Sequence, residues 1–214
     1  MPPRQDEGRF YPVEQAFAYQ GGASNTLTML QGIARLILWV AGWTPVGDPP
    51  DLDKAVFIAA PHTTNWDGFW LMVYKTERNM DIHFLAKHTI FWWPLGPVLR
   101  AMGAMSIDRT VSASTVQQVV DAFAERDHFW FALSPEGTRK WQPYWKTGFY
   151  RIAKSANVPI VLSFIDYKKK ELGIGITLPD SQTMEQDLHA IREFYAPFTG
   201  RWPERQGPIE FPPV

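Results

Sequence analysis

Residues 55–67 read AVFIAAPHTTNWD. The first six are apolar without interruption, which is typical of a strand that is buried on both faces in a mostly parallel sheet. Pro61 and His62 end this apolar run, and residues 66–74 then have helical character. The stretch therefore predicts a buried strand, a short turn with polar side chains, and a helix that follows the turn.

The same alternation of strand and helix continues along the rest of the chain. Ser114 and Gln117 have the spacing of a capping box, which predicts a helix whose Val119 and Phe123 share one face. Repeated alternation predicts an α/β fold with a mixed, mostly parallel sheet flanked by helices. Further strands are expected at residues 82–86, 129–133 and 159–164, an edge strand at 174–178, and further helices at 94–102, 147–156 and 184–195.

The N-terminal part of the chain divides into an arm, residues 1–26, and an amphipathic helix, residues 27–43. The arm lacks the basic and apolar pattern of a secretory signal. The helix is shorter than the ~20 apolar residues that cross a bilayer, and Arg35 lies on its polar side. Its apolar face comprises Met29, Leu30, Ile33, Leu36, Ile37, Val40, Ala41 and Trp43.

Two placements of this helix remain open, and they can coexist if the helix is long enough for both. Residues 27–44 can lie in a membrane interface with Trp39 and Trp43 near the lipid headgroups. They can also pack against the rest of the chain, which we expect to form a single domain over residues 27–214.

Composition excludes several classes of function. The formal net charge is −1 and no basic tract carries interleaved aromatic residues, so a nucleic-acid partner is disfavoured. The chain has no cysteine, which rules out a cysteine nucleophile and a thiolate zinc site. It has 10 Trp, 14 Phe and 7 Tyr, a content that suits either an aromatic core or contact with a membrane interface.

Polar residues follow three of the predicted strands, where α/β proteins gather their reactive groups. His62 and Asp67 belong to the first cluster and are five residues apart across a turn. A carboxylate next to an imidazole fixes one tautomer and leaves the other nitrogen to take a proton from an alcohol. The alternative is that Asp67 caps the following helix and that His62 is a loop residue.

The other two clusters are residues 106–109 and residues 134–140. Gly137 permits a tight turn, and Arg139 and Arg109 can each hold a phosphate or carboxylate with two hydrogen bonds. Together with a base they would form a site for an anionic alcohol. The alternative is that Arg109 and Arg139 pair with Asp108 and Glu136 to brace the loops.

Four blocks of the sequence, in order, resemble the glycerolipid acyltransferase family, which includes the 1-acylglycerol-3-phosphate acyltransferases. The resemblance covers about residues 55–165 and extends to the N-terminal helix and to the Lys-x-Gly stretch at residues 146–148. The four blocks are His62-Thr63-Thr64-Asn65-Trp66-Asp67 (the His-x4-Asp motif), Ile107-Asp108-Arg109, Pro135-Glu136-Gly137-Thr138-Arg139 and Val158-Pro159-Ile160-Val161.

The resemblance implies an enzyme of phospholipid biosynthesis that transfers a fatty-acyl group. The acceptor hydroxyl would attack the acyl thioester of acyl-CoA or acyl carrier protein, with His62 as base and Asp67 as its partner. The acceptor-binding residues would be Arg109, Glu136, Gly137, Thr138 and Arg139. No cofactor and no metal are implied, and the protein would be peripheral or monotopic on the cytoplasmic face of a membrane.

Departures from the family pattern border the acceptor side. Ser134 stands where the family usually has an apolar residue and Lys140 where Ser is usual. Few basic residues follow Arg109. Acyl transfer is therefore the firmer expectation, and the acceptor can be lysophosphatidic acid or another lyso-lipid. A thioester hydrolase and a catalytically silent lipid-binding module are the alternative functions.

Overall fold

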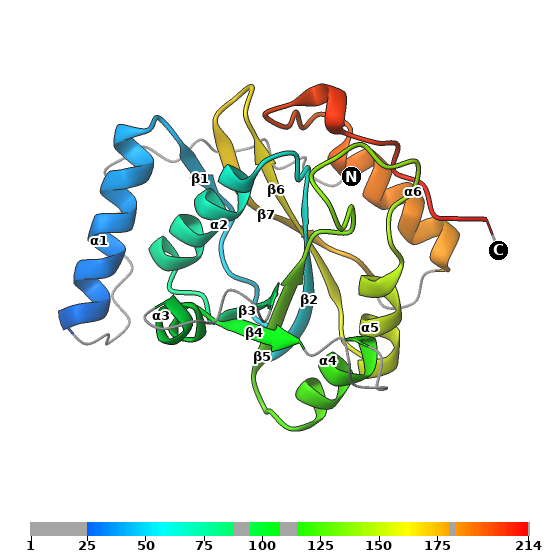
Figure 1. The fold of residues 1–214 in the computed structure, drawn as a ribbon, viewed down its shortest axis with the longest axis horizontal. Helices are drawn as coiled ribbons and strands as arrows, with labels where there is room; N and C mark the ends of the chain where they lie inside the picture. Colours follow the sequence, from blue (N-terminus) through cyan, green and yellow to red (C-terminus); the bar gives the residue numbers. More distant parts are fainter. Residues whose placement is uncertain (1–24, 88–94, 108–114, 180–182, 214) are drawn as a thin grey trace, which may run out of the picture.

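The computed structural model of the chain describes residues 25–87, 95–107, 115–179 and 183–213. Its centre is one sheet with the strand order β1-β7-β6-β2-β5-β3-β4 (Figure 1). Neighbouring strands are parallel except β6 and β7. The strands are β1 (Thr44–Val46), β2 (Lys54–Ala60), β3 (Ile82–Lys87), β4 (Ala104–Ile107), β5 (Phe129–Leu133), β6 (Ile160–Asp166) and β7 (Glu171–Thr177). The predicted α/β class with a mixed, mostly parallel sheet is confirmed.

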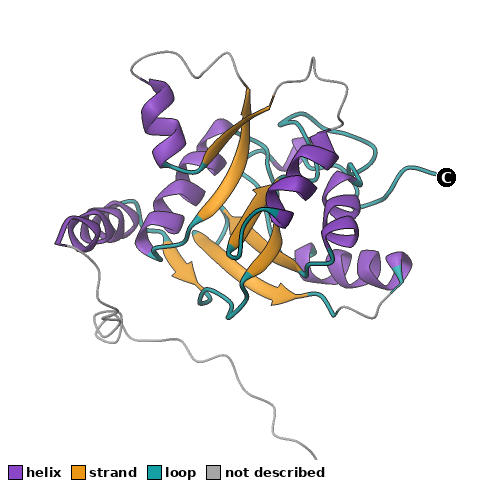
Figure 2. Cartoon of the chain, turned by 90° about the horizontal axis from the view of Figure 1, so that it is seen from below, coloured by secondary structure: helices purple, strands orange, loops and turns teal. Residues whose placement is uncertain are grey.

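Helices cover both faces of this sheet, as Figure 2 shows from below. Helices α1 and α2 lie on one side, and α4, α5 and α6 lie on the other (Figure 1). The helices are α1 (Asn25–Val40), α2 (Asn65–Glu77), α3 (Leu95–Ala101), α4 (Thr115–Ala124), α5 (Gly148–Ala156) and α6 (Met184–Tyr195), with a 3-10 turn, η3 (Pro203–Arg205).

Strand β2 explains why the sheet needs helices on both faces. Side chains alternate along a strand, so Val56 and Ile58 point into one apolar core while Ala55 and Phe57 point into the other. These four side chains are no more than 1% exposed. The uninterrupted apolar run in the sequence thus reflects two cores, one on each face of the central strand.

Two details of the sequence prediction are wrong. Strand β7 is not an edge strand, because the short strand β1 pairs with it in parallel on its outer side. Strand β1 has only three residues and includes Pro45, so no alternating pattern marks it in the sequence. In addition, helix α1 ends at Val40, and Trp43 is buried rather than part of an exposed helical face.

Helix α1 packs on α2 and turns its apolar face away from the protein. Its small contact side consists of Ala34 and Leu38, which are buried. Arg35 faces α2, where its Nε lies 3.2 Å from Oε1 of the buried Glu77. The exposed apolar side chains of α1 are Met29, Leu30, Ile33, Leu36, Ile37, Trp39 and Val40. Among the described helices, none combines the length and the hydropathy required to cross a bilayer.

Candidate active site

The carboxyl ends of β2 and β5 bring the first and third polar clusters together. The two strands are parallel neighbours, with Ile58 opposite Leu133. His62 follows the end of β2, and Glu136 follows the end of β5. Oε1 of Glu136 accepts a hydrogen bond of 2.9 Å from the backbone N–H of His62. Residues 74 positions apart in the sequence therefore meet at one edge of the sheet.

The first turn of α2 places Asp67 in contact with the turn that carries His62. Thr64 is the N-cap of the helix, and Asp67 closes a capping box with it. Oδ2 of Asp67 accepts hydrogen bonds from the N–H groups of Thr63, at 2.7 Å, and Thr64, at 2.8 Å. The carboxylate is thus fixed by backbone donors of the turn that carries His62.

His62 and Asp67 form a dyad. Nδ1 of His62 lies 3.2 Å from Oδ2 of Asp67, within the reach of a hydrogen bond. The His62 side chain is 23% exposed and that of Asp67 only 1%, so the imidazole is open to a substrate and the carboxylate is not. Asp67 caps the helix and orients the histidine at the same time, so the two alternatives drawn from the sequence for this carboxylate are both true of its geometry.

Glu136 is the second buried carboxyl group of the site. Burial raises the pKa of Glu136 from 4.5 to about 7, and the hydrogen bond from the backbone of His62 opposes this shift. The bond itself fixes the backbone of the His62 loop against the loop after β5. Glu136 therefore holds the loop of His62 in place through the backbone N–H of His62.

The turn after Glu136 depends on Gly137. Its φ of 65° is in the left-handed region, and a Cβ there would collide with the side chain of Lys146. The Gly137 N–H closes the turn by a 3.1 Å bond to the carbonyl of Ser134. The ammonium group of Lys146 thus lies over the turn at Gly137. From the sequence, Lys146 was indicated only as part of the Lys-x-Gly stretch that resembles the acyltransferase family.

The remaining predicted acceptor-binding residues are Thr138, Arg139 and Arg109. Thr138 is half-buried and Arg139 is exposed, both just beyond the Gly137 turn. Within the described ranges, Glu136 and Arg139 form no ion pair with each other, so bracing by that pair is not observed. Arg109 and Asp108 lie outside the described residues.

Two parts of the site were missed in the sequence. Tyr167 follows the end of β6, a parallel neighbour of β2, and its hydroxyl donates to Oδ1 of Asp67 at 2.7 Å. The C-terminal segment covers Thr63, since the N–H of Trp202 donates to Oγ1 of Thr63 and Nη1 of Arg205 donates to its carbonyl. Tyr167 could have been found by applying the strand-end rule to β6 as well; no sequence signal indicated the C-terminal contacts.

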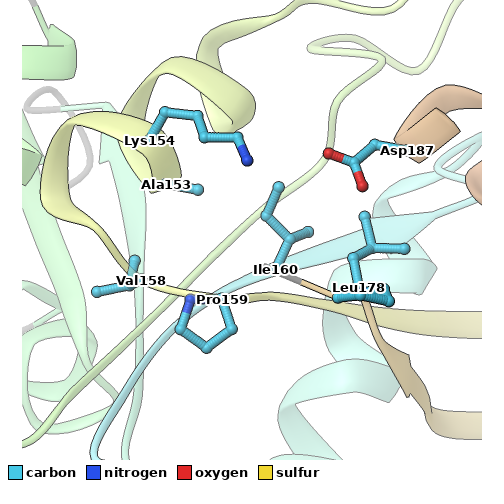
Figure 3. A pocket seen from close by; sticks show the side chains of 8 residues that line it. Ala153, Lys154, Val158, Pro159, Ile160, Leu178 and Asp187 are labelled. Atoms are coloured by element: carbon cyan, nitrogen blue, oxygen red, sulfur yellow. The ribbon is translucent and has the colours of Figure 1, made fainter. Parts of the chain in front are cut away.

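Two small cavities with room for about a water molecule lie near the strands. One, of about 40 Å³, borders Glu136 and is lined in part by Ala60, Trp145 and Tyr195. Another, of about 20 Å³, lies between α5, β6 and α6 (Figure 3). It borders Ile160, which is level with Val56 and therefore about 20 Å along the strand from His62. The second cavity is separate from the dyad.

The described residues define a site for proton transfer to or from a hydroxyl group. Nδ1 of His62 faces a buried carboxylate, so Nε2 is the nitrogen that can accept a proton from a substrate. Among the described residues, no group of three or more His, Asp or Glu side chains is arranged to hold a metal ion.

The fold and the dyad define an α/β protein with a paired histidine and carboxylate at the carboxyl ends of parallel strands. The Acyltransferase family model matches residues 45–163, which is more than half of the chain. The protein therefore belongs to the Acyltransferase family, and the resemblance drawn from the four sequence blocks is confirmed at the level of the family.

A solved structure with a similar fold is the crystal structure of the 1-acyl-sn-glycerophosphate (LPA) acyltransferase PlsC from Thermotoga maritima. The two structures superpose with a TM-score of 0.56 at 16% sequence identity, over 85% of this chain and 82% of that chain. At this identity the likeness shows a shared fold. A search of the curated proteins found no match to this sequence.

Proposed function

We propose that the protein is an O-acyltransferase that moves a fatty-acyl group from acyl-CoA or acyl carrier protein to the hydroxyl of a glycerolipid or lyso-lipid, lysophosphatidic acid among them. The observation that carries the proposal is the dyad, with Nδ1 of His62 3.2 Å from a carboxylate that is 1% exposed. Membership of the Acyltransferase family supports the reaction class.

The reaction follows from this geometry. Nε2 of His62 removes the proton of the acceptor hydroxyl while its oxygen attacks the thioester carbonyl. The tetrahedral intermediate collapses with cleavage of the carbon–sulfur bond, and the imidazolium returns its proton to the leaving thiolate. Asp67 stabilises the imidazolium between these two steps. The products are an ester and a free thiol, and no acyl-enzyme is formed.

The acceptor is bound, in this proposal, by the turn after β5 and by Arg109. Arg139 is exposed just beyond Gly137, and the ammonium group of Lys146 lies over the same turn. Cationic side chains near the base favour an acceptor with an anionic headgroup. The loop with Glu136 and Gly137 would fix the distance between that headgroup and His62.

Helix α1 is, we propose, the membrane-docking element. A helix on the surface of a soluble domain turns its apolar side inward, whereas α1 directs Arg35 towards Glu77 and exposes Ile33, Leu36 and Ile37. An exposed apolar face of this size is typical of an interaction site. Docking in the interface would let a lipid acceptor reach His62 without transfer of its acyl chain through water.

The test is release of free thiol by purified protein that is given acyl-CoA or acyl carrier protein with a panel of lyso-lipids. Acceptor-dependent release and an ester product are expected, with His62→Ala reducing the rate by about 10²–10⁴-fold. His189→Ala, a change at an exposed histidine of α6, serves as the matched control and should keep full activity.

Each alternative function predicts a different result. Equal thiol release with and without acceptor would identify a thioester hydrolase. Lipid binding without thiol release would identify a non-catalytic module. Normal turnover by folded His62→Ala would refute the proposed role of the dyad.

A further inference from the structure

The Asp67 carboxylate has donors on both oxygens, and only one oxygen faces the histidine. Oδ2 accepts from the N–H groups of Thr63 and Thr64 and lies beside Nδ1 of His62. Oδ1 accepts a 2.7 Å hydrogen bond from the hydroxyl of Tyr167. Because Asp67 is 1% exposed, bulk water cannot replace that hydroxyl without a rearrangement.

Tyr167 is held in place by contacts on several sides. Its backbone N–H donates to the carbonyl of Thr199 at 2.9 Å. Its ring meets Trp43 edge to face, with 5.0 Å between ring centroids. The preceding residue, Asp166, is fully buried and accepts from the N–H of Lys168 and of Thr199. The hydroxyl is therefore presented to Asp67 by a rigid part of the fold.

The hydroxyl remains a donor over the whole pH range in which the enzyme would work. Burial, together with the bond to Asp67, raises the pKa of Tyr167 well above its usual value, and the nearby Arg201 guanidinium opposes this shift. Tyr167 therefore stays protonated, and its proton points at Asp67.

Other charged side chains lie near the hydrogen bonds that join His62, Asp67 and Tyr167. Glu136 accepts from the backbone of His62, and its pKa is raised to about 7. Arg201 lies near the Tyr167 hydroxyl, and Arg205 donates to the carbonyl of Thr63. Among these groups Glu136 is the one that titrates near neutral pH, so its contribution has to be separated in any measurement.

We propose that Tyr167 is a positioning residue for the reaction: its hydroxyl shares the negative charge of Asp67 and so limits how strongly Asp67 favours protonation of His62. The inference rests on the proposed function of His62 as a base. A carboxylate whose charge is shared with a second donor attracts the imidazolium less. His62 is then protonated less often before the acceptor binds, and more of the enzyme has a free base.

Tyr167→Phe tests this role, because it removes the hydroxyl and keeps the ring that contacts Trp43. With Oδ1 unpaired, Asp67 should attract the imidazolium more strongly. The acid limb of the kcat/KM profile should then move to higher pH by about 0.5–1 unit. Activity on that limb should fall by about threefold to tenfold and recover towards the wild-type value at alkaline pH, with little change in KM for the acceptor.

Tyr150→Phe is the matched control. The Tyr150 hydroxyl also bonds to a buried carboxylate, that of Asp187, which borders the cavity in Figure 3. Its loss should lower stability and leave the pH profile unchanged. If the role of Tyr167 is purely structural, Tyr167→Phe should also lower stability without moving the acid limb of the kcat/KM profile, and that outcome would overturn the inference.

A second measurement does not depend on activity. The NMR titration of the His62 imidazole, assigned with His62→Ala, should have its midpoint at higher pH in Tyr167→Phe than in the wild type. The comparison is repeated with Glu136→Gln in both proteins, which removes the titration of Glu136. In an Asp67→Asn background the Tyr167 substitution should have no further effect on the midpoint.

The two proposals fail in different ways. A shifted midpoint in a protein that transfers no acyl group would support the link between Tyr167 and His62 and refute the acyltransferase function. Acyl transfer with an unchanged midpoint and an unchanged profile in Tyr167→Phe would do the reverse.

Discussion

At the scale of single residues, the site contains two buried carboxyl groups that differ in the donors they meet. Asp67 is anchored by backbone donors and faces the imidazole of His62. Among the described residues, Glu136 accepts from the backbone N–H of His62, and burial raises its pKa to about 7. One acidic residue thus lies against the imidazole of His62 and the other against its backbone, and the difference arises from the donors that each one meets.

Glu136 should make the stability of the protein depend on pH. Burial raises its folded-state pKa from 4.5 to about 7, so the stabilisation from the neutral carboxyl is fully present below about 4.5 and is lost as the pH rises through about 7. Glu136→Gln keeps an oxygen for the His62 N–H and carries no charge. Relative to wild type, it should gain up to about 3 kcal/mol between pH 4 and 8.

Denaturant unfolding of both proteins at a series of pH values measures this difference. Groups remote from Glu136 titrate alike in the two proteins, so the gap between the two curves reports Glu136 together with its coupling to His62 and Asp67. Parallel curves across the range would show that Glu136 titrates at its ordinary value and that its burial has no such effect.

At the scale of elements, helix α1 exposes its large apolar side chains and packs a narrow side against the protein. Ala34 and Leu38 fit against α2, and larger apolar side chains remain outside. The sequence predicted the apolar face correctly for the helix itself, but it placed Trp43 on that face. In the structure Trp43 lies beyond the helix, buried against Trp70 and Tyr167, so of the two tryptophans expected near the lipid headgroups Trp39 is exposed, at 70%, and Trp43 is not.

Replacement of Ile33 and Ile37 by Asp should release the protein from liposomes. Both side chains are exposed on the outer face of α1, so the change removes apolar contact with lipid and leaves the core intact. Sedimentation with vesicles that contain anionic lipid measures the bound fraction. The matched control is Ile176→Asp with Met184→Asp, which changes the charge equally at exposed apolar positions outside α1. Equal sedimentation of both double variants would argue against docking through α1.

At the scale of the whole molecule, the C-terminal part of the chain packs against the strands and the loop that carry the site. The hydroxyl of Tyr195, at the end of α6, donates to the carbonyls of Ile58 in β2 and Ser163 in β6. Beyond it, Trp202 and Arg205 bond to Thr63, next to His62. The last helix and the tail therefore fix the two central strands and the loop at their carboxyl ends.

Tyr195→Phe should lower the free energy of unfolding by about 1–3 kcal/mol, because it removes a buried donor to the Ser163 carbonyl and to the Ile58 carbonyl, although Ile58 still accepts from the Ser163 hydroxyl. Tyr195 is 4% exposed, so water cannot easily replace the hydroxyl. Tyr144→Phe, at a side chain that is 41% exposed, should change the stability by less than about 0.5 kcal/mol. Chemical denaturation compares the two, and equal stabilities would show that the Tyr195 bonds contribute nothing net.

The sequence by itself determined what depends on local order along the chain. Uninterrupted apolar runs identified β2, β5 and β6, because strands buried on both faces tolerate few polar side chains. The strand-end rule and the spacing of His62 and Asp67 identified the dyad, because a single turn of chain brings the two together. The order of the four blocks identified the family.

Only the tertiary structure decided which distant groups complete the site. Tyr167 reaches Asp67 across 100 positions of sequence, and Arg205 reaches Thr63 across 142. Short β1 and the burial of Trp43 likewise depend on pairing with segments far along the chain. Such contacts depend on the tertiary fold, which no periodic pattern in the sequence indicates. The order of strands in the sheet places the hydroxyl of Tyr167 next to the carboxylate of Asp67.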